Sequence, residues 1–169
     1  MIYTPREDSF LLEMEVKKYA ENRVVLDLGS GSGIQSLAAK RSNAKSILAT
    51  DIDQESVAQV NSLGIKCIKS DIFSNIKGKF DLIVFNPPYL PKDKNEPKNF
   101  RIATAGGKKG DEIILKFLKQ ACKYLNKRGM ILIVISSLTP QHRINKLLAT
   151  LNLKKQILSS QSFFMETLE

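Results

Sequence analysis

A glycine-rich stretch near the start of the chain has the composition of a ligand-binding loop. Residues 27–33 read Asp-Leu-Gly-Ser-Gly-Ser-Gly and overlap the end of the apolar segment Arg23–Leu28, which is typical of a buried β-strand. Gly29 and Gly31 allow the backbone to turn tightly and to approach a ligand. The spacing G-x-G-x-G differs from the G-x-G-x-x-G fingerprint of dinucleotide sites, and the carboxylate of Asp27 would repel a pyrophosphate. An ammonium group, such as that of an amino acid, suits this carboxylate instead.

Two further acidic residues stand where predicted strands end. Asp51 ends the strand predicted over Ser46–Asp51, and Asp71 follows the short strand predicted over Ile65–Lys69. A carboxylate at the first position can accept hydrogen bonds from both ribose hydroxyls, and one at the second position from an adenine amino group. Ammonium, ribose and adenine together describe S-adenosyl-L-methionine, which we expect to be the cofactor. The alternative is that Asp51 and Asp71 only cap the helices after them.

The motif Asn86-Pro87-Pro88-Tyr89 follows the strand predicted over Phe80–Phe85, so it reaches the same edge of the sheet. Two prolines fix the backbone, so the Asn86 side-chain oxygen and a neighbouring carbonyl can both accept hydrogen bonds from one NH2 group. These acceptors raise the electron density on a conjugated nitrogen as it attacks a sulfonium methyl group. We therefore assign catalysis to Asn86, Pro87 and Tyr89, with Pro88 as a further substrate contact and Tyr89 as a flat face for a planar group. The alternative is an Asn-Pro turn in which Tyr89 only packs.

The elements that must position these residues alternate between strands and helices. The predicted strands are Arg23–Leu28, Ser46–Asp51, Ile65–Lys69, Phe80–Phe85 and Met130–Ser136, with one or two closing strands in Leu153–Thr167. The predicted helices are Arg6–Tyr19, Gly33–Arg41, Gln54–Leu63, Gly110–Asn126 and Thr139–Leu151. This alternation predicts an α/β fold with a doubly wound, Rossmann-like sheet that is mostly parallel, with an antiparallel C-terminal strand and helices on both sides. Met130–Ser136 is so apolar that both of its faces should be covered. Leu90–Lys109, rich in Pro, Lys, Asn and Gly, is predicted to be a long substrate-side loop.

Length and composition exclude several classes of protein. A chain of 169 residues fits one domain, and 43% hydrophobic with 25% charged residues is typical of a globular fold. No apolar run approaches the ~20 residues of a membrane helix, and the first residues do not read as a signal peptide. We therefore expect a soluble, cytoplasmic protein without membrane contact. Cys67 and Cys122 are expected to be buried core thiols with no metal site, and a single histidine, His142, disfavours a Ser/His/Asp hydrolase.

The net charge favours an anionic partner. Lys and Arg number 26 against 17 Asp and Glu, which gives a formal net charge of +9. RNA, DNA or a ribonucleoprotein would fit this basic surface. Because the basic residues are scattered, an ordinary solvated surface is the alternative reading.

At these motifs the chain resembles the class I S-adenosylmethionine-dependent methyltransferases that modify amide or exocyclic nitrogens through N-P-P-Y. Two further stretches, Tyr-Thr-Pro-Arg-Glu-Asp-Ser-Phe-Leu-Leu at 3–12 and Ala-Gly-Gly-Lys-Lys-Gly at 105–110, are similar to the short HemK-type release-factor glutamine methyltransferases of archaea and eukaryotes. The resemblance covers nearly the whole chain. It implies a single methyltransferase domain over residues 1–169, in which residues 1–22 fold over the cofactor. It also implies cofactor contacts from Ser9, Asp27, Gly29, Asp51, Asp71, Ile72 and Asn86.

The resemblance implies that the chain methylates the glutamine of the Gly-Gly-Gln loop in a class 1 translation release factor. Three alternatives stay open. N-P-P-Y also serves adenine N6 or guanine N2 in DNA or RNA, which would suit the basic charge. Lysine methylation is credited to some relatives, although an amine needs deprotonation rather than two acceptors. A non-catalytic cofactor-binding subunit is the third, and the intact Asn86–Tyr89 motif speaks against it.

A small zinc-binding activator protein is implied by the resemblance as a heterodimer partner. The short strand Ile65–Lys69 should lie at a sheet edge, where its free backbone groups can pair with a strand of another chain. The alternative is that Lys66 and Lys69 protect a solvated edge.

Overall fold

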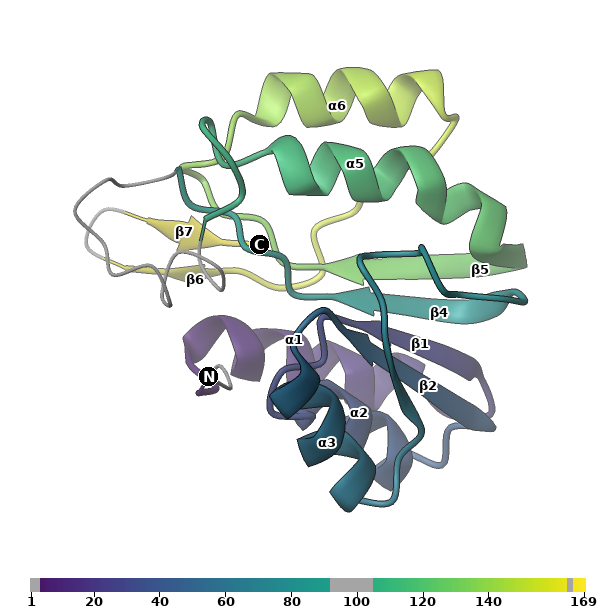
Figure 1. Cartoon of the computed structure of the whole chain (residues 1–169). Helices are drawn as coiled ribbons and strands as arrows, with labels where there is room; N and C mark the ends of the chain where they lie inside the picture. Colours follow the sequence, from purple (N-terminus) through teal and green to yellow (C-terminus); the bar gives the residue numbers. More distant parts are fainter. Residues whose placement is uncertain (1–3, 92–104, 164–165) are drawn as a thin grey trace. The chain divides into compact units, whose positions relative to one another are not determined.

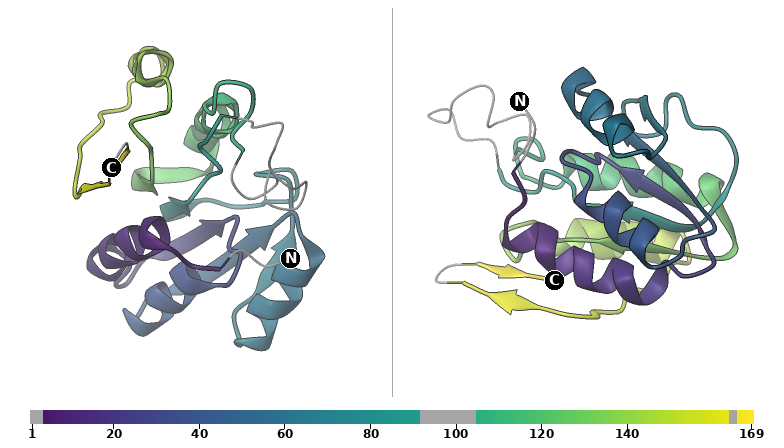
Figure 2. Two further views of the ribbon diagram at one scale, coloured as in Figure 1. Left: turned by 90° about the vertical axis from the view of Figure 1, so that its left-hand side faces the viewer. Right: turned by 90° about the horizontal axis from the view of Figure 1, so that it is seen from below.

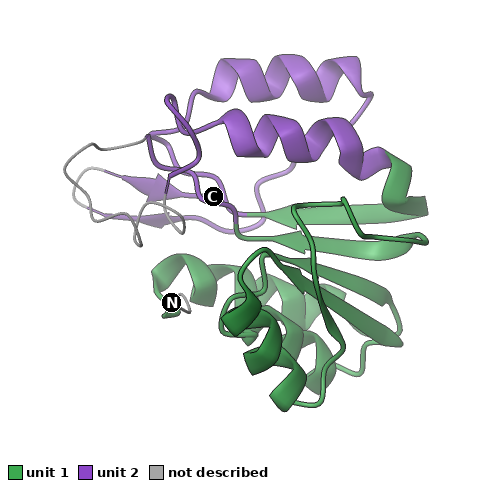
Figure 3. Ribbon diagram, viewed as in Figure 1, with its two compact units in different colours: residues 1–86, 123–133 green, residues 87–122, 134–169 purple. Residues whose placement is uncertain are grey.

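The computed structural model describes residues 4–91, 105–163 and 166–169. The chain forms two compact units, drawn in different colours in Figure 3. Unit 1 comprises Met1–Asn86 and Lys123–Ile133, and unit 2 comprises Pro87–Cys122 and Val134–Glu169. Most of the predicted loop Leu90–Lys109 lies outside the described residues.

Unit 1 is built on a five-stranded sheet whose strands are all parallel (Figure 1). Its strands are β1 (Val24–Leu28), β2 (Ser46–Asp51), β3 (Cys67–Lys69), β4 (Phe80–Phe85) and β5 (Leu125–Ile133). Their order across the sheet is β3-β2-β1-β4-β5, so the chain moves outward from β1 in one direction and later continues from β4 in the other. This order confirms the predicted doubly wound α/β sheet, and β3 lies at an edge as expected.

The two central strands supply the core of unit 1. Val25 and Leu26 in β1 are fully buried, as are Leu82, Ile83 and Val84 in β4. Burial on both faces explains why these strands read as continuous apolar runs rather than as alternating patterns. β5 differs, because Leu132 is its one buried residue. The prediction that the apolar strand Met130–Ser136 would be covered on both faces holds in part: Leu132, Val134, Ile135 and Ser136 are buried, whereas Met130, Ile131 and Ile133 are half-buried.

Three helices of unit 1 lie along one face of this sheet (Figure 2), namely α1 (Glu7–Tyr19), α2 (Ile34–Arg41) and α3 (Gln54–Ser62). α2 joins β1 to β2 and α3 joins β2 to β3, and right-handed crossovers in the same direction place both helices on the same side. α1 packs beside α2 and reaches β5. Its contact face is the apolar stripe that contains Leu12 and Val16.

The boundaries predicted for the long helix and for the strand after it are wrong. The helix predicted over Gly110–Asn126 ends early, as α5 (Glu112–Ala121) followed by the 3-10 turn η1 (Cys122–Tyr124). The strand starts at Leu125 because this residue pairs with Phe80, whereas Met130 pairs with Leu82, so the intervening residues form a bulge. Within unit 1, the Tyr124 ring stacks on Phe73 with centroids 4.4 Å apart, which stabilises the turn from which the strand begins. β5 also ends at Ile133, before the predicted limit.

Unit 2 contains α5, α6 (Gln141–Thr150) and the antiparallel pair β6 (Gln161–Ser162) and β7 (Thr167–Leu168). Antiparallel C-terminal pairing was predicted, and it occurs in this separate two-stranded sheet rather than in the five-stranded one. α6 begins directly after Pro140, which occupies its N-cap. Proline has no N–H, so its position at a helix start leaves no backbone donor unsatisfied.

The composition-based expectations have mixed outcomes. Cys67 is buried in β3 as expected, but Cys122 is half-buried because it lies in the turn between α5 and β5. Within the described ranges, no helix is both long and apolar enough to cross a membrane.

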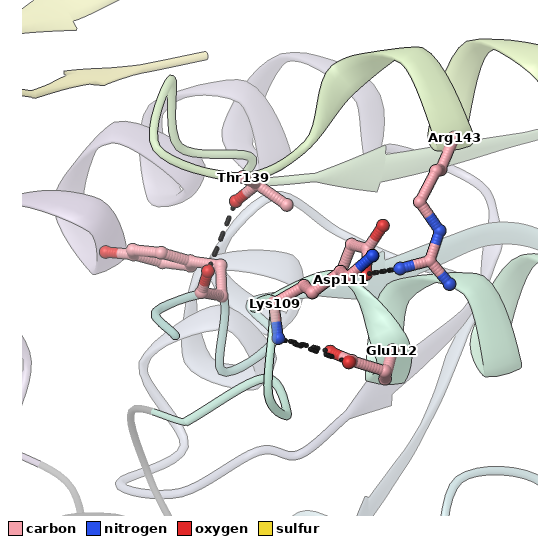
Figure 4. A network of polar contacts seen from close by, with 6 residues as sticks. Lys109, Asp111, Glu112, Thr139 and Arg143 are labelled. Carbon is pink, nitrogen blue, oxygen red and sulfur yellow. Dashed lines mark hydrogen bonds and ion pairs between the residues drawn. The ribbon is translucent and has the colours of Figure 1, made fainter. Parts of the chain in front are cut away.

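A partly buried ion pair joins α5 and α6 of unit 2 (Figure 4). Asp111, at the N-cap of α5, has no exposed surface, and its Oδ1 accepts a hydrogen bond from Nη1 of Arg143 in α6 at 2.8 Å. One residue further on, the Glu112 carboxylate accepts the backbone N–H of Lys109 at 3.1 and 3.2 Å. The second carboxylate oxygen of Asp111 is buried without a hydrogen-bond partner among the described residues. Arg143 is therefore the cation that compensates this carboxylate.

Replacing Arg143 by alanine should destabilise the protein, because Asp111 would remain buried without a cation. We expect the free energy of unfolding to fall by about 1 to 3 kcal/mol, measured by urea denaturation. His142→Ala, at an exposed position of the same helical turn, is the matched control and should change stability by less than about 0.5 kcal/mol. Equal effects of the two substitutions would contradict the role given to the pair.

Candidate active site

The candidate site lies at the switch point of the sheet in unit 1. β1 and β4 are neighbours, with Leu28 paired to Phe85 at their carboxyl ends. The connections that leave these strands run in opposite directions, and open α/β sheets bind ligands at such points. Gly29 and Asn86 directly follow the paired positions. The glycine loop and the acceptor asparagine therefore begin side by side.

Two hydrogen bonds connect the glycine loop to the carboxyl end of β2. The Ser30 N–H donates to the Thr50 carbonyl oxygen at 2.9 Å, and the Gly31 N–H donates to Oδ2 of Asp51 at 2.8 Å. Gly31 has a φ of 50°, in the left-handed region that glycine adopts without steric cost. This conformation aims its N–H at the carboxylate, so the loop curves over the strand end as its glycine spacing predicts.

Asp51 does not cap the helix that follows it. Its two carboxylate oxygens accept the N–H groups of Gly31 and of Asp53, the latter at 2.9 Å. α3 is capped by Asp53, whose side chain accepts the Glu55 N–H at 3.4 Å. The helix-cap alternative is therefore wrong for Asp51. A carboxylate offers about four acceptor positions, so these two bonds leave capacity for the two hydroxyls of a ribose.

Asp27 is a carboxylate that burial makes difficult to ionise. It is 1% exposed in β1, and the Ser36 hydroxyl donates to its Oδ2 at 2.6 Å. Burial raises the pKa of Asp27 from 3.8 to about 7; hydrogen bonds from Ser36 oppose this shift, and the nearby charge of Asp51 adds to it. A cationic group bound here would offset the desolvation of the carboxylate, which fits the ammonium contact predicted from the sequence.

The loop after β3 carries backbone strain. Ile72 has a φ of 52°, which is a genuine outlier for a β-branched residue and is typical of functional loops. The Ser70 hydroxyl holds this conformation by donating to the Ile72 carbonyl oxygen at 2.9 Å and accepting the Asn75 N–H at 3.2 Å. Asp71 precedes Ile72 and is exposed, and the described segment after it forms turns rather than a helix. The helix-cap alternative is therefore wrong for Asp71 as well.

The NH2 end of the Asn86 amide is hydrogen-bonded, whereas its oxygen has no hydrogen-bond partner among the described residues. Its Nδ2 donates to Oδ2 of Asp8, at the start of α1, at 3.0 Å. Its Oδ1 is buried and has no hydrogen-bond partner among the described residues. Buried polar atoms are almost always hydrogen-bonded, so this oxygen is a candidate acceptor for a bound ligand. The N-P-P-Y reading assigns the same atom to the substrate nitrogen.

Ser9 lies beside this pair in the first turn of α1. Its hydroxyl donates to Oδ1 of Asp8 at 3.1 Å and accepts the Arg6 N–H at 3.4 Å. Its carbonyl oxygen accepts Nε2 of Gln35, at the start of α2, at 2.8 Å. Ser9 thus connects α1 to the helix that follows the glycine loop, while its own contact with the cofactor remains a prediction.

In unit 2, the segment Pro87–Tyr89 is held by the loop at 105–110. The Gly106 N–H donates to the Leu90 carbonyl oxygen at 2.9 Å, and a Cβ on Gly106 would lie only 2.5 Å from the Pro88 carbonyl oxygen. Thr139 Oγ1 donates to the Tyr89 carbonyl oxygen at 3.2 Å. The A-G-G-K-K-G motif therefore fixes the backbone of the substrate motif, a role that its sequence alone does not indicate.

The structure brings together in unit 1 most of the residues that the sequence predicts for the cofactor. Those at the carboxyl ends of β1, β2 and β4 are Asp27, Gly29, Gly31, Asp51 and Asn86. Pro87, Pro88 and Tyr89 belong to unit 2. Sequence reasoning missed Asp8 and Gln35, although Asp8 stands inside the E-D-S segment that carried the family resemblance.

A doubly wound sheet with this glycine loop and acidic residues at its strand ends defines a Rossmann-like, class I methyltransferase. The chain belongs to the methyltransferase small domain family, whose sequence profile matches residues 8–165. It is an S-adenosylmethionine-dependent methyltransferase of the HemK type, which confirms the resemblance found in its motifs.

Relatives with assigned names support this placement. The chain is 40% identical over 155 residues to the Methanocaldococcus jannaschii protein named "Putative protein N5-glutamine methyltransferase MJ0928", covering 86% of this chain and 78% of that protein. It is 32% identical over 151 residues to mouse methyltransferase HEMK2, covering 79% and 71%. It is 33% identical over 150 residues to the release factor glutamine methyltransferase of Streptococcus pneumoniae, covering 79% of this chain and 54% of that longer protein.

A solved structure has the same fold. The crystal structure of the ribosomal protein L11 methylase of Lactobacillus delbrueckii subsp. bulgaricus matches 99% of this chain and 79% of its own, with a TM-score of 0.72 and 26% identity.

Cofactor binding should depend on pH through Asp27. With a pKa of about 7 in the free protein, Asp27 is mostly protonated at pH 6, and an ammonium ligand must displace that proton. Affinity for S-adenosyl-L-methionine should therefore rise as pH increases from 5.5 to 7, by up to about tenfold per pH unit. Calorimetry in buffers of different ionisation enthalpy should detect the released proton.

Asp27→Asn is the control for this titration. This variant should bind the cofactor weakly, and calorimetry should detect no proton released on binding. Because the raised pKa means that the folded state holds a proton which the unfolded state has lost, Asp27 lowers stability progressively between about pH 4 and 7. An asparagine side chain does not titrate and lacks this penalty, so the Asp27→Asn variant should be at least as stable as the parent at pH 8. A pH-independent affinity in the parent protein would contradict the assignment.

Proposed function

We propose that this methyltransferase modifies the side-chain amide nitrogen of the glutamine in the Gly-Gly-Gln loop of a class 1 translation release factor. The observation that carries the proposal is the buried Oδ1 of Asn86, an acceptor without a donor among the described residues. Relatives named for N5-glutamine and release factor methylation support the same substrate. A glutamine amide has two N–H groups to donate and no proton that must first be removed.

The residues of unit 1 fit S-adenosyl-L-methionine as the methyl donor. Asp27 would bind its ammonium group and Asp51 its ribose hydroxyls, while Asp71 and Ile72 would face the adenine. The backbone at Gly29 and Gly31 leaves room for close approach, and Ser9 would add a hydroxyl contact. When bound, this cofactor supplies a methyl group on a positively charged sulfur.

Asn86 would then orient the acceptor and increase its reactivity. Its Oδ1 accepts an N–H of the substrate amide, which raises the electron density on nitrogen and fixes its direction of attack. Pro87 and Pro88 have no N–H groups, so the motif offers carbonyl acceptors rather than competing donors. Tyr89 would present its ring to the plane of the amide.

The test of the substrate is transfer of a labelled methyl group from S-adenosyl-L-methionine to a class 1 release factor, to tRNA and to duplex DNA. We expect label in the release factor, lost when the Gly-Gly-Gln glutamine is replaced by alanine. Label in tRNA or DNA instead would favour a base methyltransferase, which the net charge of +9 would suit. Strong labelling of a release factor with lysine at that position would favour lysine methylation.

Asn86→Ala should abolish the reaction while leaving the fold intact. Loss of an orienting acceptor should reduce kcat about 100-fold or more, with the dissociation constant for the cofactor changed by less than about tenfold. Asn126→Ala is the matched control, because Asn126 also donates to an aspartate, Asp81 at 2.6 Å, at the opposite end of the same sheet. A decrease below about tenfold in kcat for Asn86→Ala would contradict the mechanism.

We also propose that a small zinc-binding activator protein pairs with β3. β3 lies at a sheet edge, where Ile68 is partly exposed and Lys69 exposed. Cys67 packs into the core with Val60 and Ile65. A partner strand at this edge would therefore meet the side chains of Ile68 and Lys69. Unpaired strand edges accept strands from other chains.

Ile68→Asp should therefore prevent co-purification with such a partner without lowering the intrinsic affinity for the cofactor. Met14→Asp, at a half-exposed apolar position of α1, is the control and should leave association unchanged. The isolated chain should be poorly active until the partner is added. A fully active, monodisperse monomer on a sizing column would refute an obligate partner.

A further inference from the structure

The Asn86 amide is hydrogen-bonded to a residue 78 positions earlier in the chain. An asparagine amide can occupy the same space in two orientations that exchange its oxygen and its NH2 group. Only one of them presents an acceptor to the substrate nitrogen; the other would present N–H groups to the N–H groups of the substrate. A neighbouring side chain must select between the two orientations, and in the part of the chain that the structure describes Asp8 binds the Asn86 amide.

Asp8 is suited to this selection because its contacts hold it as an acceptor. It is 6% exposed, and its Oδ1 accepts both the backbone N–H of Ser9 at 2.6 Å and the Ser9 hydroxyl at 3.1 Å. Its Oδ2 accepts Nδ2 of Asn86 at 3.0 Å. A carboxylate cannot donate a hydrogen bond, so it binds the NH2 end of the amide and excludes the flipped orientation.

The same turn of α1 is tied to the glycine loop. The Ser9 carbonyl oxygen accepts Nε2 of Gln35 at 2.8 Å, and Gln35 lies two residues after Gly33, in the first turn of α2. Movement of this turn relative to the loop would therefore break a buried hydrogen bond. The position of Asp8 is set by the element that carries the predicted cofactor loop.

From these contacts we infer that Asp8 is a positioning residue, which holds the Asn86 amide with its oxygen toward the acceptor nitrogen. The inference rests on the proposed function, since it assigns a role within the same site. Asp8 touches neither methyl donor nor acceptor in this role. It acts through Asn86, and the start of α1 thereby connects the cofactor loop with the acceptor site.

The first experiment compares substitutions at Asp8 and Asp81. It distinguishes a change in the orientation of the Asn86 amide from a general loss of protein stability. Asp8→Ala should lower kcat about 10- to 100-fold, while KM for S-adenosyl-L-methionine stays within about threefold. Asp8→Asn keeps an oxygen that can accept from Nδ2, so it should recover part of the lost activity. Asp81→Asn is the matched control, because Asp81 likewise accepts a backbone N–H, that of Val24 at 2.9 Å, and an asparagine Nδ2. It should leave kcat unchanged.

The second experiment needs no acceptor substrate. The side-chain NH2 signals of Asn86, identified by their loss in Asn86→Ser, should shift in Asp8→Ala and remain in place in Asp81→Asn, as followed by nitrogen-proton NMR. If these signals shift but the parent enzyme does not methylate glutamine, the proposed substrate is wrong and the positioning role stands. If they do not shift, or if Asp8→Ala keeps kcat within about twofold of the parent, the positioning role is refuted.

Discussion

The pairing of β1 with β4 is the constraint on which the site depends. With Leu28 opposite Phe85, the two segments that leave these strands must begin at neighbouring points, one with glycines and one with an asparagine. Both strands are buried on both faces, so the fit of their side chains against the layers on each side maintains this register, since a slip by one residue would exchange the side chains that face each layer. The adjacency of the glycine loop and Asn86, to which we assign the methyl donor and the acceptor, is therefore a consequence of core packing.

The three acidic residues of the site differ in how deeply each carboxylate is buried. Asp27 is in the central strand and resists ionisation, so a cationic ligand gains from neutralising it. Asp51, one strand outward, is held by two backbone N–H groups, and Asp71 is exposed beyond the edge strand. The order of the strands thus arranges the carboxylates by burial as well as by position, from the ammonium pocket predicted at Asp27 to the adenine contact predicted at Asp71.

Sequence patterns could predict the parts of this structure that local interactions determine. Apolar runs and glycine spacing located β1, β2, β4 and the loop over Gly29 and Gly31. The boundary between α5 and β5 could not be predicted in this way, because two contacts with residues distant in sequence determine it. Leu125 begins the strand by pairing with Phe80, and the Tyr124 ring stacks on Phe73 just before it. The same limit applies to the site. N-P-P-Y identifies Asn86, but the contact with Asp8 joins segments on separate elements and leaves no local signal.

Hydrogen bonding to Asp8 has an electronic consequence as well as a geometric one. When the NH2 end of an amide donates to a carboxylate, the amide is polarised and its oxygen becomes a stronger acceptor, more so where water is excluded. Oδ1 of Asn86 is buried, so the effect is not screened by solvent. The carboxylate oxygens of Asp8 accept hydrogen bonds from Ser9 and Asn86, so Asp8 acts on the substrate only through Asn86. The site can thus offer a neutral but strengthened acceptor, which suits an uncharged NH2 group better than an ammonium ion.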